Sequence, residues 1–317
     1  MKKIRSNSGV VRRKTKILAR LIVLIICLCI AAVLGFLVYT VLLKSGQNDK
    51  PGAQSLAVSW NNSEYQTVYD QSAVLLEDYS FNSTALFYHG ISAFYLAAAQ
   101  TDTALAQSYI DEAIHNLRIA LQFAHSKTKP QISYMLGKAY FQKNVFSSYH
   151  YFSDTAVKYL EKAVDLGYES SDIPEYLGLS YADLGMTQKS IDSFTNALLV
   201  RESDILLLAI AQQYLAVNNK ETAKQYLYKA AKDSKNDILI LKSKSLLAQL
   251  YFDEGKYDDA LSEYTAILEK DPEYADAYYG LGLLYEQQGD TAKARAEWRK
   301  VLKIQVNHQG AINKLGL

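Results

Sequence analysis

The sequence predicts an all-α protein in which one membrane-spanning helix precedes an α-solenoid, an elongated stack of helical hairpins. Two observations predict this class. In the C-terminal half, Tyr251 and Tyr285 are 34 residues apart, and the small and large residues around them recur at the same interval, which indicates a repeat architecture. Near the N-terminus, residues 21–43 carry no charge, and 23 residues of helix are long enough to cross the ~30 Å hydrocarbon core of a bilayer. Only four prolines occur in 317 residues, which argues against a turn-rich β architecture.

Residues 1–20 form a basic tail before this span, with eight basic residues and no acidic one. Only Lys44 and Lys50 follow the span closely, so the positive-inside rule places the N-terminus in the cytoplasm and the rest of the chain on the far side. A cleavable signal peptide would have an apolar region of roughly 7–15 residues that ends at small residues, and neither feature is present. We therefore expect a single-pass protein of a bacterial cytoplasmic (inner) membrane whose repeats are periplasmic.

The body of the chain has few residues that could support catalysis or hold a cofactor. Both cysteines, Cys27 and Cys29, lie inside the predicted span, which excludes a disulfide scaffold, a thiolate metal site and a cysteine nucleophile from residues 44–317. The five histidines include no pair at metal-ligand spacing, and no phosphate-binding loop or nucleophile motif occurs. We expect no cofactor, no metal and no enzymatic activity.

The net charge of the body gives no sign of a nucleic-acid partner. Removing the eight basic residues of the tail from the total of 34 leaves 26 basic residues against 33 acidic ones. A mildly acidic body has no electrostatic footprint for nucleic acid. Proteins or peptides are the expected partners, and the 25 tyrosines leave self-association as a homo-oligomer open.

The chain after the span divides into a linker and a repeat region. Residues 44–63 are polar and are predicted to be a linker, with a short helix near Trp60 as the alternative. From residue 64 to residue 317, apolar residues recur at spacings of three and four, as in amphipathic helices. One tyrosine marks the first helix of each of five units: Tyr140, Tyr181, Tyr214, Tyr251 and Tyr285.

The first of these intervals is irregular. Tyr140 and Tyr181 are 41 residues apart, and the seven extra residues fall before Ala156. This insertion, residues 144–154, contains several aromatic side chains and predicts either a lengthened hairpin or an aromatic-rich loop. We expect it to form a second contact surface or to pack locally.

Two segments show the repeated pattern most clearly: LLAQLYFDEGKYDDALSEYTAILEKDP and YYGLGLLYEQQGDTAKARAEWRKVL. Each has a small residue and a tyrosine in its first helix, a turn glycine, and a small, a large and an apolar residue in its second helix. This pattern resembles the tetratricopeptide repeat. The resemblance covers roughly residues 129–305, with a weaker unit at 84–123, a degenerate helix at 64–77 and a capping helix at 309–317.

The resemblance implies a superhelical domain of about five to six repeats plus a cap over residues 64–317. The small residues Gly282 and Ala294 allow the two helices of a hairpin to approach closely, and the large Trp298 fills the space between neighbouring repeats. Gly289 permits the positive φ of the tight turn. Asn144 and Asn218 take the place of this turn glycine in their units.

In this family the first helices of the hairpins line a concave groove that binds proteins or peptides. The resemblance therefore implies a set of groove-facing residues, which combines aromatic and aliphatic anchors with polar neighbours. The set is Tyr134, Lys138, Phe141, Glu175, Leu179, Leu208, Gln212, Leu215, Gln249, Phe252, Tyr279, Leu283 and Glu286.

These features predict a membrane-anchored scaffold or assembly factor that holds envelope or secretion components near the membrane. The alternative keeps the fold but reverses its setting, as a receptor that faces the cytosol and delivers proteins at a membrane surface.

Overall fold

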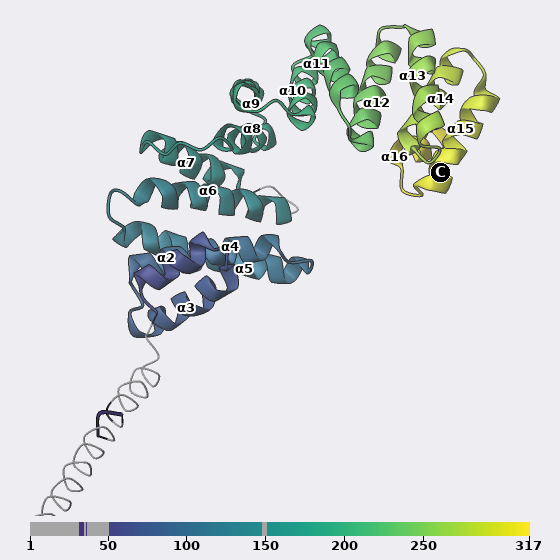
Figure 1. Ribbon diagram of the computed structural model, residues 1–317. Coiled ribbons are helices and arrows are strands. Elements are labelled where there is room, and N and C mark those ends of the chain that lie inside the picture. The colour runs from purple at the N-terminus through teal and green to yellow at the C-terminus, as the bar shows by residue number, and fades with distance from the viewer. Residues whose placement is uncertain (1–31, 35, 37–50, 148–150) are drawn as a thin grey trace, which may run out of the picture.

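The computed structural model describes residues 51–147 and 151–317, together with residues 32–34 and 36. Every regular element in these residues is a helix, and no strand occurs among them. The helices stack into an elongated, curved array that runs from α2 at one end to α16 at the other (Figure 1). The predicted all-α repeat architecture is therefore confirmed.

The N-terminal predictions concern mostly residues outside this description. The basic tail, residues 1–20, and all of the predicted span 21–43 except residues 32–34 and 36 lie outside the described residues. In the part of the chain that the structure describes, we find no helix with the length and apolar character needed to cross a membrane.

The helices have the following bounds: α2 Ala53–Asn61, α3 Tyr65–Asp78, α4 Ser83–Ala98, α5 Thr103–Phe123, α6 Lys129–Phe146, α7 Ser153–Asp165, α8 Ile173–Asp183, α9 Thr187–Val200, α10 Asp204–Ala216, α11 Lys220–Asp233, α12 Asp237–Asp253, α13 Tyr257–Lys270, α14 Ala275–Gln287, α15 Thr291–Ile304 and α16 Gln309–Leu315.

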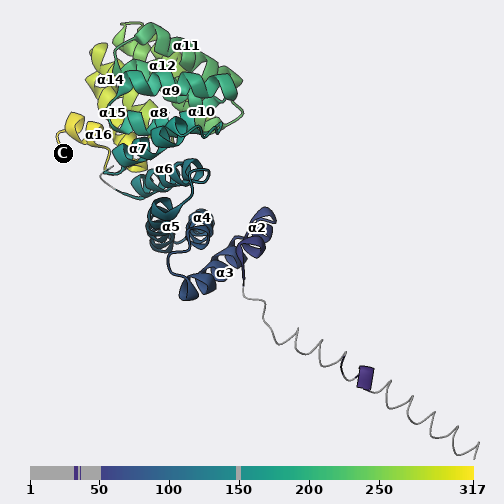
Figure 2. The ribbon, with the colours of Figure 1, turned by 90° about the vertical axis from the view of Figure 1, so that its left-hand side faces the viewer.

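Successive helices pair into six hairpins: α4–α5, α6–α7, α8–α9, α10–α11, α12–α13 and α14–α15. Helices α2 and α3 precede the first hairpin, and α16 packs on the last. In the view of Figure 2, α2 and α3 lie at one end of the molecule, apart from the C-terminal hairpins. A single hairpin cannot bury its apolar face, so each hairpin is stabilised by its neighbours in the stack.

The small residues of the first helices allow close packing, as the sequence predicted. A Cβ atom placed on Gly282 would lie 2.2 Å from the indole nitrogen of Trp298, and one on Gly178 would lie 2.5 Å from the ring of Phe194. Both large residues are buried, Phe194 to 1% and Trp298 to 2% exposure. In α8–α9 and α14–α15, a large side chain of the second helix thus uses the space where a Cβ atom is missing on the first.

The turns within the hairpins follow the prediction at Asn218 and depart from it at Asn144. Asn218 has φ of 57° and takes the conformation that Gly289 adopts with φ of 80°. Asn144 lies inside α6 and is buried, so its predicted role in a turn is wrong. Its side-chain amide donates to Asp183 (2.9 Å), and its side-chain oxygen accepts from the backbone N–H of Phe152 (3.0 Å). These bonds fix the connection to α7, so α6 continues past the usual turn position.

The seven extra residues between Tyr140 and Tyr181 are divided between a longer helix α6 and the connection to α7. Helix α6 continues six residues past Tyr140, whereas α14 ends two residues past Tyr285. The remaining extra residues lie between Phe146 and Ser153, where residues 148–150 are outside the described part. Residues 53–61 of the predicted linker form α2, in which Leu56 is fully buried, so a short helix is present near Trp60.

Candidate partner-binding surface

Side chains from three first helices meet around one lysine. The Nζ atom of Lys138, on α6, lies 5.8 Å from the ring centre of Phe94 on α4, 5.1 Å from that of Tyr134 and 5.0 Å from that of Tyr176 on α8. These distances are in the range of cation–π contacts. The first helices therefore turn these side chains toward a common face of the array, the face on which the sequence placed the groove.

A carboxylate from the loop before α8 completes this arrangement. Lys138 donates to Asp172 (3.0 Å) and to the hydroxyl of Tyr134 (3.1 Å). Tyr134 donates to the same carboxylate at 2.7 Å, and Ser170 donates to it at 2.5 Å. Tyr168 stacks on Tyr134 with ring centres 4.7 Å apart. We name Phe94, Tyr134, Lys138, Tyr168, Ser170, Asp172 and Tyr176 the lysine cluster.

Hydrogen bonds in the lysine cluster keep Lys138 protonated and Asp172 ionised. Burial lowers the pKa of Lys138, but its hydrogen bonds to Tyr134 and Asp172 outweigh this effect, so the pKa is raised. Burial also opposes ionisation of Asp172, but hydrogen bonds from Ser170, Tyr134 and Lys138 bring its pKa below the ordinary value. Burial is the main cause that raises the pKa of Tyr134 to about 12. At neutral pH the cluster holds an ammonium, a carboxylate and a neutral phenol, which suits recognition and positioning rather than acid–base catalysis.

Further aromatic rings continue from the lysine cluster in both directions along the first helices. Toward the N-terminus, the ring of Tyr95 lies 5.4 Å from Trp60 and stacks on Tyr65 at 4.7 Å. Toward the C-terminus, Phe141 meets Tyr176 edge-on at 5.0 Å. All five rings are half-buried. We name Trp60, Tyr65, Tyr95, Phe141 and the lysine cluster together the aromatic surface.

The structure brings the first three predicted groove residues together. Tyr134, Lys138 and Phe141 all belong to the aromatic surface. Glu175 is next to Tyr176 in the sequence, but its carboxylate accepts from Arg201 at 3.2 Å. Leu179 packs with Phe194 in the core between α8 and α10.

The predicted groove residues of the middle hairpins do not form a comparable cluster. Leu208 is only 8% exposed and belongs to a core cluster against which Leu215 also packs. Gln212 is exposed. Gln249 donates to Asp253, one turn later on the same helix (2.9 Å), and Phe252 lies against the ring of Tyr257 at 5.6 Å.

The three predicted residues of α14 face the C-terminal helix rather than an open groove. The ring of Tyr279 lies 4.9 Å from that of His308 and fills the space beside Gly310. Leu283 packs in the cluster that contains Leu315, and Glu286 forms an ion pair with Lys314. Helix α16 lies where the first helix of a next repeat would pack, so it covers Tyr279 and Leu283, whereas Glu286 stays exposed.

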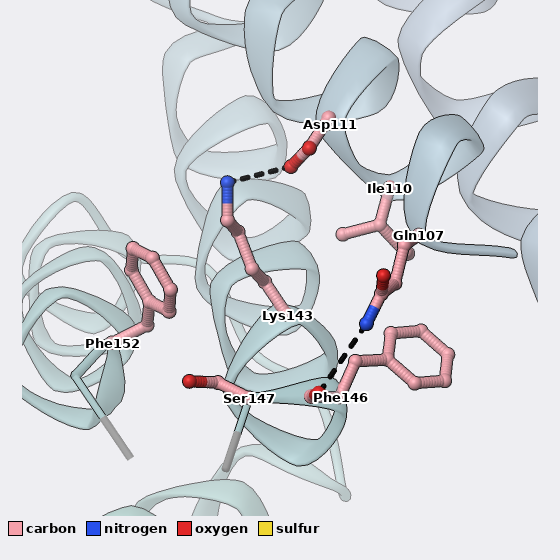
Figure 3. A pocket seen from close by; sticks show the side chains of 7 residues that line it. All are labelled: Gln107, Ile110, Asp111, Lys143, Phe146, Ser147 and Phe152. Atoms are coloured by element: carbon pink, nitrogen blue, oxygen red, sulfur yellow. Dashed lines mark hydrogen bonds and ion pairs between the residues drawn. The ribbon is translucent and has the colours of Figure 1, made fainter. Parts of the chain in front are cut away.

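A separate small cavity of 180 Å³ lies beside the predicted insertion (Figure 3). Lys143 spans it to form an ion pair with Asp111 (2.6 Å), and its Nζ lies 4.9 Å from the ring centre of Phe152. Gln107 donates to the carbonyl oxygen of Phe146 (3.3 Å). These contacts join α5 to α6 and to the start of α7, so the described ends of the insertion pack locally.

Sequence reasoning missed most residues of the aromatic surface. Asp172, Tyr168 and Ser170 lie in a loop between hairpins, and Phe94 lies in the weaker unit at 84–123. Tyr176 lies on the same helix as the predicted groove residues Glu175 and Leu179 but was not among them. The unusual number of tyrosines was the available signal, but it did not indicate which of them meet in space. Among the described residues, no group of histidine, cysteine and carboxylate side chains could hold a metal ion.

Comparison with known proteins agrees with this architecture. Residues 245–305 match the sequence model of the tetratricopeptide repeat family. No curated protein matches the sequence. Two solved structures align over most of the array: the C-terminal part of a TPR repeat-containing protein from Cytophaga hutchinsonii (15% identity, 84% of this chain and 100% of that chain, TM-score 0.59) and the apo form of the quorum sensor NprR from B. thuringiensis (17% identity, 86% and 80%, TM-score 0.58).

A third structure, the TPR protein YrrB, aligns over 56% of this chain and 91% of its own with 25% identity and a TM-score of 0.44. The likeness to the first two structures concerns the fold, and the match at residues 245–305 concerns the sequence. Residues 245–305 therefore match the tetratricopeptide repeat in sequence, and the six stacked hairpins share the fold of the first two structures.

Proposed function

We propose that this protein is a membrane-anchored scaffold that holds a protein or peptide partner on its aromatic surface. Proteins with these repeats generally act as interaction scaffolds. The observation that carries the proposal is the convergence of rings from α2, α3, α4, α6 and α8 on one face, with a fixed lysine at its centre. Half-buried tyrosine and tryptophan side chains are the usual anchors of protein interfaces, because they offer a large contact area and lose little conformational entropy.

The chemistry of the lysine cluster indicates what kind of partner fits. Asp172 already neutralises Lys138, so the surface has little free positive charge with which to clamp a carboxylate. The hydroxyl groups of Tyr134 and Ser170 are likewise committed to Asp172. An extended segment with apolar or aromatic side chains therefore fits better than an acidic one.

The anchor is the second part of the proposal. Residues 32–34 and 36 of the predicted span are helical, and the side chains of Val33, Leu34 and Phe36 are 59%, 56% and 66% exposed. Exposed apolar side chains on a helix suit a lipid environment. With the basic tail in the cytoplasm, the repeats would meet envelope or secretion components outside it, and tethering would raise their local concentration.

The binding site can be tested by site-specific photo-crosslinking in membranes of the native host. A photo-reactive residue at Phe141 should crosslink a partner, and one at the exposed Tyr228 on α11 should not. Alanine at both Tyr95 and Tyr176 should abolish the crosslink, whereas the matched control, alanine at the exposed Tyr228 and Tyr257, should preserve it. Equal crosslinking from Phe141 in both double variants, with helical content retained, would reject the aromatic surface as the binding site.

The cytosol-facing receptor remains the second candidate, because the orientation depends on the charge rule alone. Alkaline phosphatase, which needs an oxidising compartment, can be fused after Leu317 in a bacterial host. High activity is expected for the proposed orientation. A stable fusion without activity would assign the repeats to the cytosol and favour the receptor.

A further inference from the structure

The two long edges of the array are formed by two different kinds of connection between helices. The turns within hairpins, such as residues 99–102, lie on one edge, which we name the turn edge. The loops that join one hairpin to the next, such as 79–82 and 124–128, lie on the other, which we name the loop edge. Helix α5 has 21 residues and separates the two edges by about 30 Å.

The loop edge carries an exposed aromatic patch at its N-terminal end. Phe81 and Phe123 are 66% and 52% exposed, and their rings contact each other across two loops with centres 5.4 Å apart. Tyr79 beside them is 65% exposed. We name Tyr79, Phe81, Phe123, His125 and Lys127 the entry patch.

The two loops of the entry patch carry basic residues only, in contrast to the acidic body as a whole. The loops 79–82 and 124–128 contain Lys127 and His125 and no carboxylate. The nearest acidic residues in the sequence, Glu77 and Asp78, lie on the last turn of α3. Exposed aromatic rings beside a lysine are the side chains that occupy the interface between lipid head groups and acyl chains.

The chain also enters the array toward this edge. Trp60, at the end of α2, contacts Tyr65 at the start of α3 and Tyr95 near the end of α4. Helix α2 therefore ends near the turn edge, and its first residues point toward the loop edge. The chain between Leu43, where the predicted span ends, and Ala53 can reach at most about 35 Å, so an anchored array keeps this part of its surface close to the bilayer.

We propose that the entry patch lies on the lipid surface and orients the repeat array, with the aromatic surface held at a defined angle to the membrane. This inference rests on the membrane anchor of the proposed function. Three partly inserted aromatic side chains bind a bilayer weakly by themselves, but the anchor supplies the local concentration that makes a weak contact persist. Tyr79, Phe81 and Phe123 thus form a lipid-contacting site that orients the array, and the turn edge stays in water.

The test uses the full chain in vesicles of phosphatidylethanolamine and phosphatidylglycerol with brominated acyl chains. In a Cys27→Ala, Cys29→Ala background, a fluorophore is attached at Ser80→Cys or Ser126→Cys beside the patch, or at Thr101→Cys on the turn edge. All three positions are exposed and polar, so the aromatic side chains stay intact. The labels at Ser80→Cys and Ser126→Cys should lose fluorescence to the brominated lipid, and the label at Thr101→Cys should not.

A label at Lys44→Cys, next to the predicted span, separates the two proposals. Quenching there, with residues 80 and 126 no more quenched than residue 101, would keep the anchor and reject the entry patch. No quenching at Lys44→Cys would reject both. Disulfide cross-linking between two copies through Ser126→Cys, without quenching, would assign the patch to a second copy and also reject the proposal.

A second pair of variants tests whether the aromatic rings themselves make the contact. Phe81→Ser with Phe123→Ser should reduce quenching at Ser126→Cys to the level at Thr101→Cys. The matched control, Leu105→Ser with Val145→Ser, removes two exposed apolar side chains from the turn edge and should change nothing. Unchanged quenching in the first double variant would show that tether length alone brings the loop edge near lipid. The proposed lipid contact of the entry patch would then be rejected.

Discussion

The hairpins α6–α7 and α14–α15 are equivalent repeat units, yet their first helices have different surroundings. Around α14, the groove positions Tyr279 and Leu283 are covered by α16, Glu286 is paired with Lys314 of that helix, and the turn at Gly289 is regular. Around α6, Lys138 meets side chains from α4 and α8 and the carboxylate of Asp172 from the loop before α8. Helix α6 is also longer, with 18 residues against 13 in α14. The regular half of the array is therefore the easier half to recognise, whereas the irregular half carries the polar and aromatic chemistry.

The largest expected effect is the loss of stability when a large buried side chain is removed from either half of the array. Phe194 and Trp298 fill equivalent sites, and alanine at either should cost about 3–5 kcal/mol locally. Phe194 lies in the middle of the array, so Phe194→Ala should separate urea unfolding into two transitions. Trp298→Ala should loosen only the last hairpin and α16, because repeat arrays are stabilised by nearest neighbours. Hydrogen exchange resolves the two cases, and identical exchange patterns for both variants would contradict the prediction.

The next effect compares two ion pairs. Lys138→Met leaves Asp172 half-buried without its cation and should destabilise the protein by about 1–3 kcal/mol. The matched pair in the regular half, Lys244 with Glu263 at 3.0 Å, is more exposed at its lysine (33% against 12%), so Lys244→Met should cost less than about 1 kcal/mol. Urea unfolding measures both. Adding Asp172→Asn to Lys138→Met should recover part of the loss, and equal costs for the two lysines would contradict the comparison.

A smaller effect concerns acid. The pKa of Asp172 is below its ordinary value of 3.8 in the folded protein, so the carboxylate stabilises the fold above that value and loses this contribution as the pH falls through the folded pKa. The α6–α8 region should therefore lose protection below about pH 4. Hydrogen exchange over this pH range, compared with the Asp172→Asn variant, checks it. If both proteins lost protection equally at acid pH, Asp172 would not be the cause.

The smallest effect concerns a turn. Asn218 adopts the positive φ that Gly255 and Gly289 adopt in their hairpins. Asn218→Gly should raise stability by less than about 1 kcal/mol, because glycine has no Cβ atom to strain this conformation. Gly289→Ala should lower it by about 1 kcal/mol. Thermal unfolding measures both, and a loss of stability in Asn218→Gly would show that the asparagine side chain contributes more than its backbone strain costs.

The sequence by itself determined the fold class, the hairpins and the positions of their small and large residues. The close approach at Gly282 could be predicted because small and large residues recur with the period of the repeat, whereas the contact of Trp298 with Gly282 in its own hairpin was not predicted. The turns at Gly255, Gly289 and Asn218 follow for the same reason. Local constraints that repeat along the chain leave a periodic signal, which a single sequence is enough to reveal.

Only the tertiary structure decided what surrounds the candidate surface. The lysine cluster joins Phe94, Lys138 and Asp172 from different repeats and a loop, and no period relates these positions. The sequence did not reveal that α16 covers Tyr279, nor that Asn144 binds Asp183 and lets α6 continue past its turn. Such contacts depend on how the helices stack, since burial and distance rather than spacing select the partners. The fold could therefore be predicted from repetition, but the site depends on contacts that only the tertiary structure brings together.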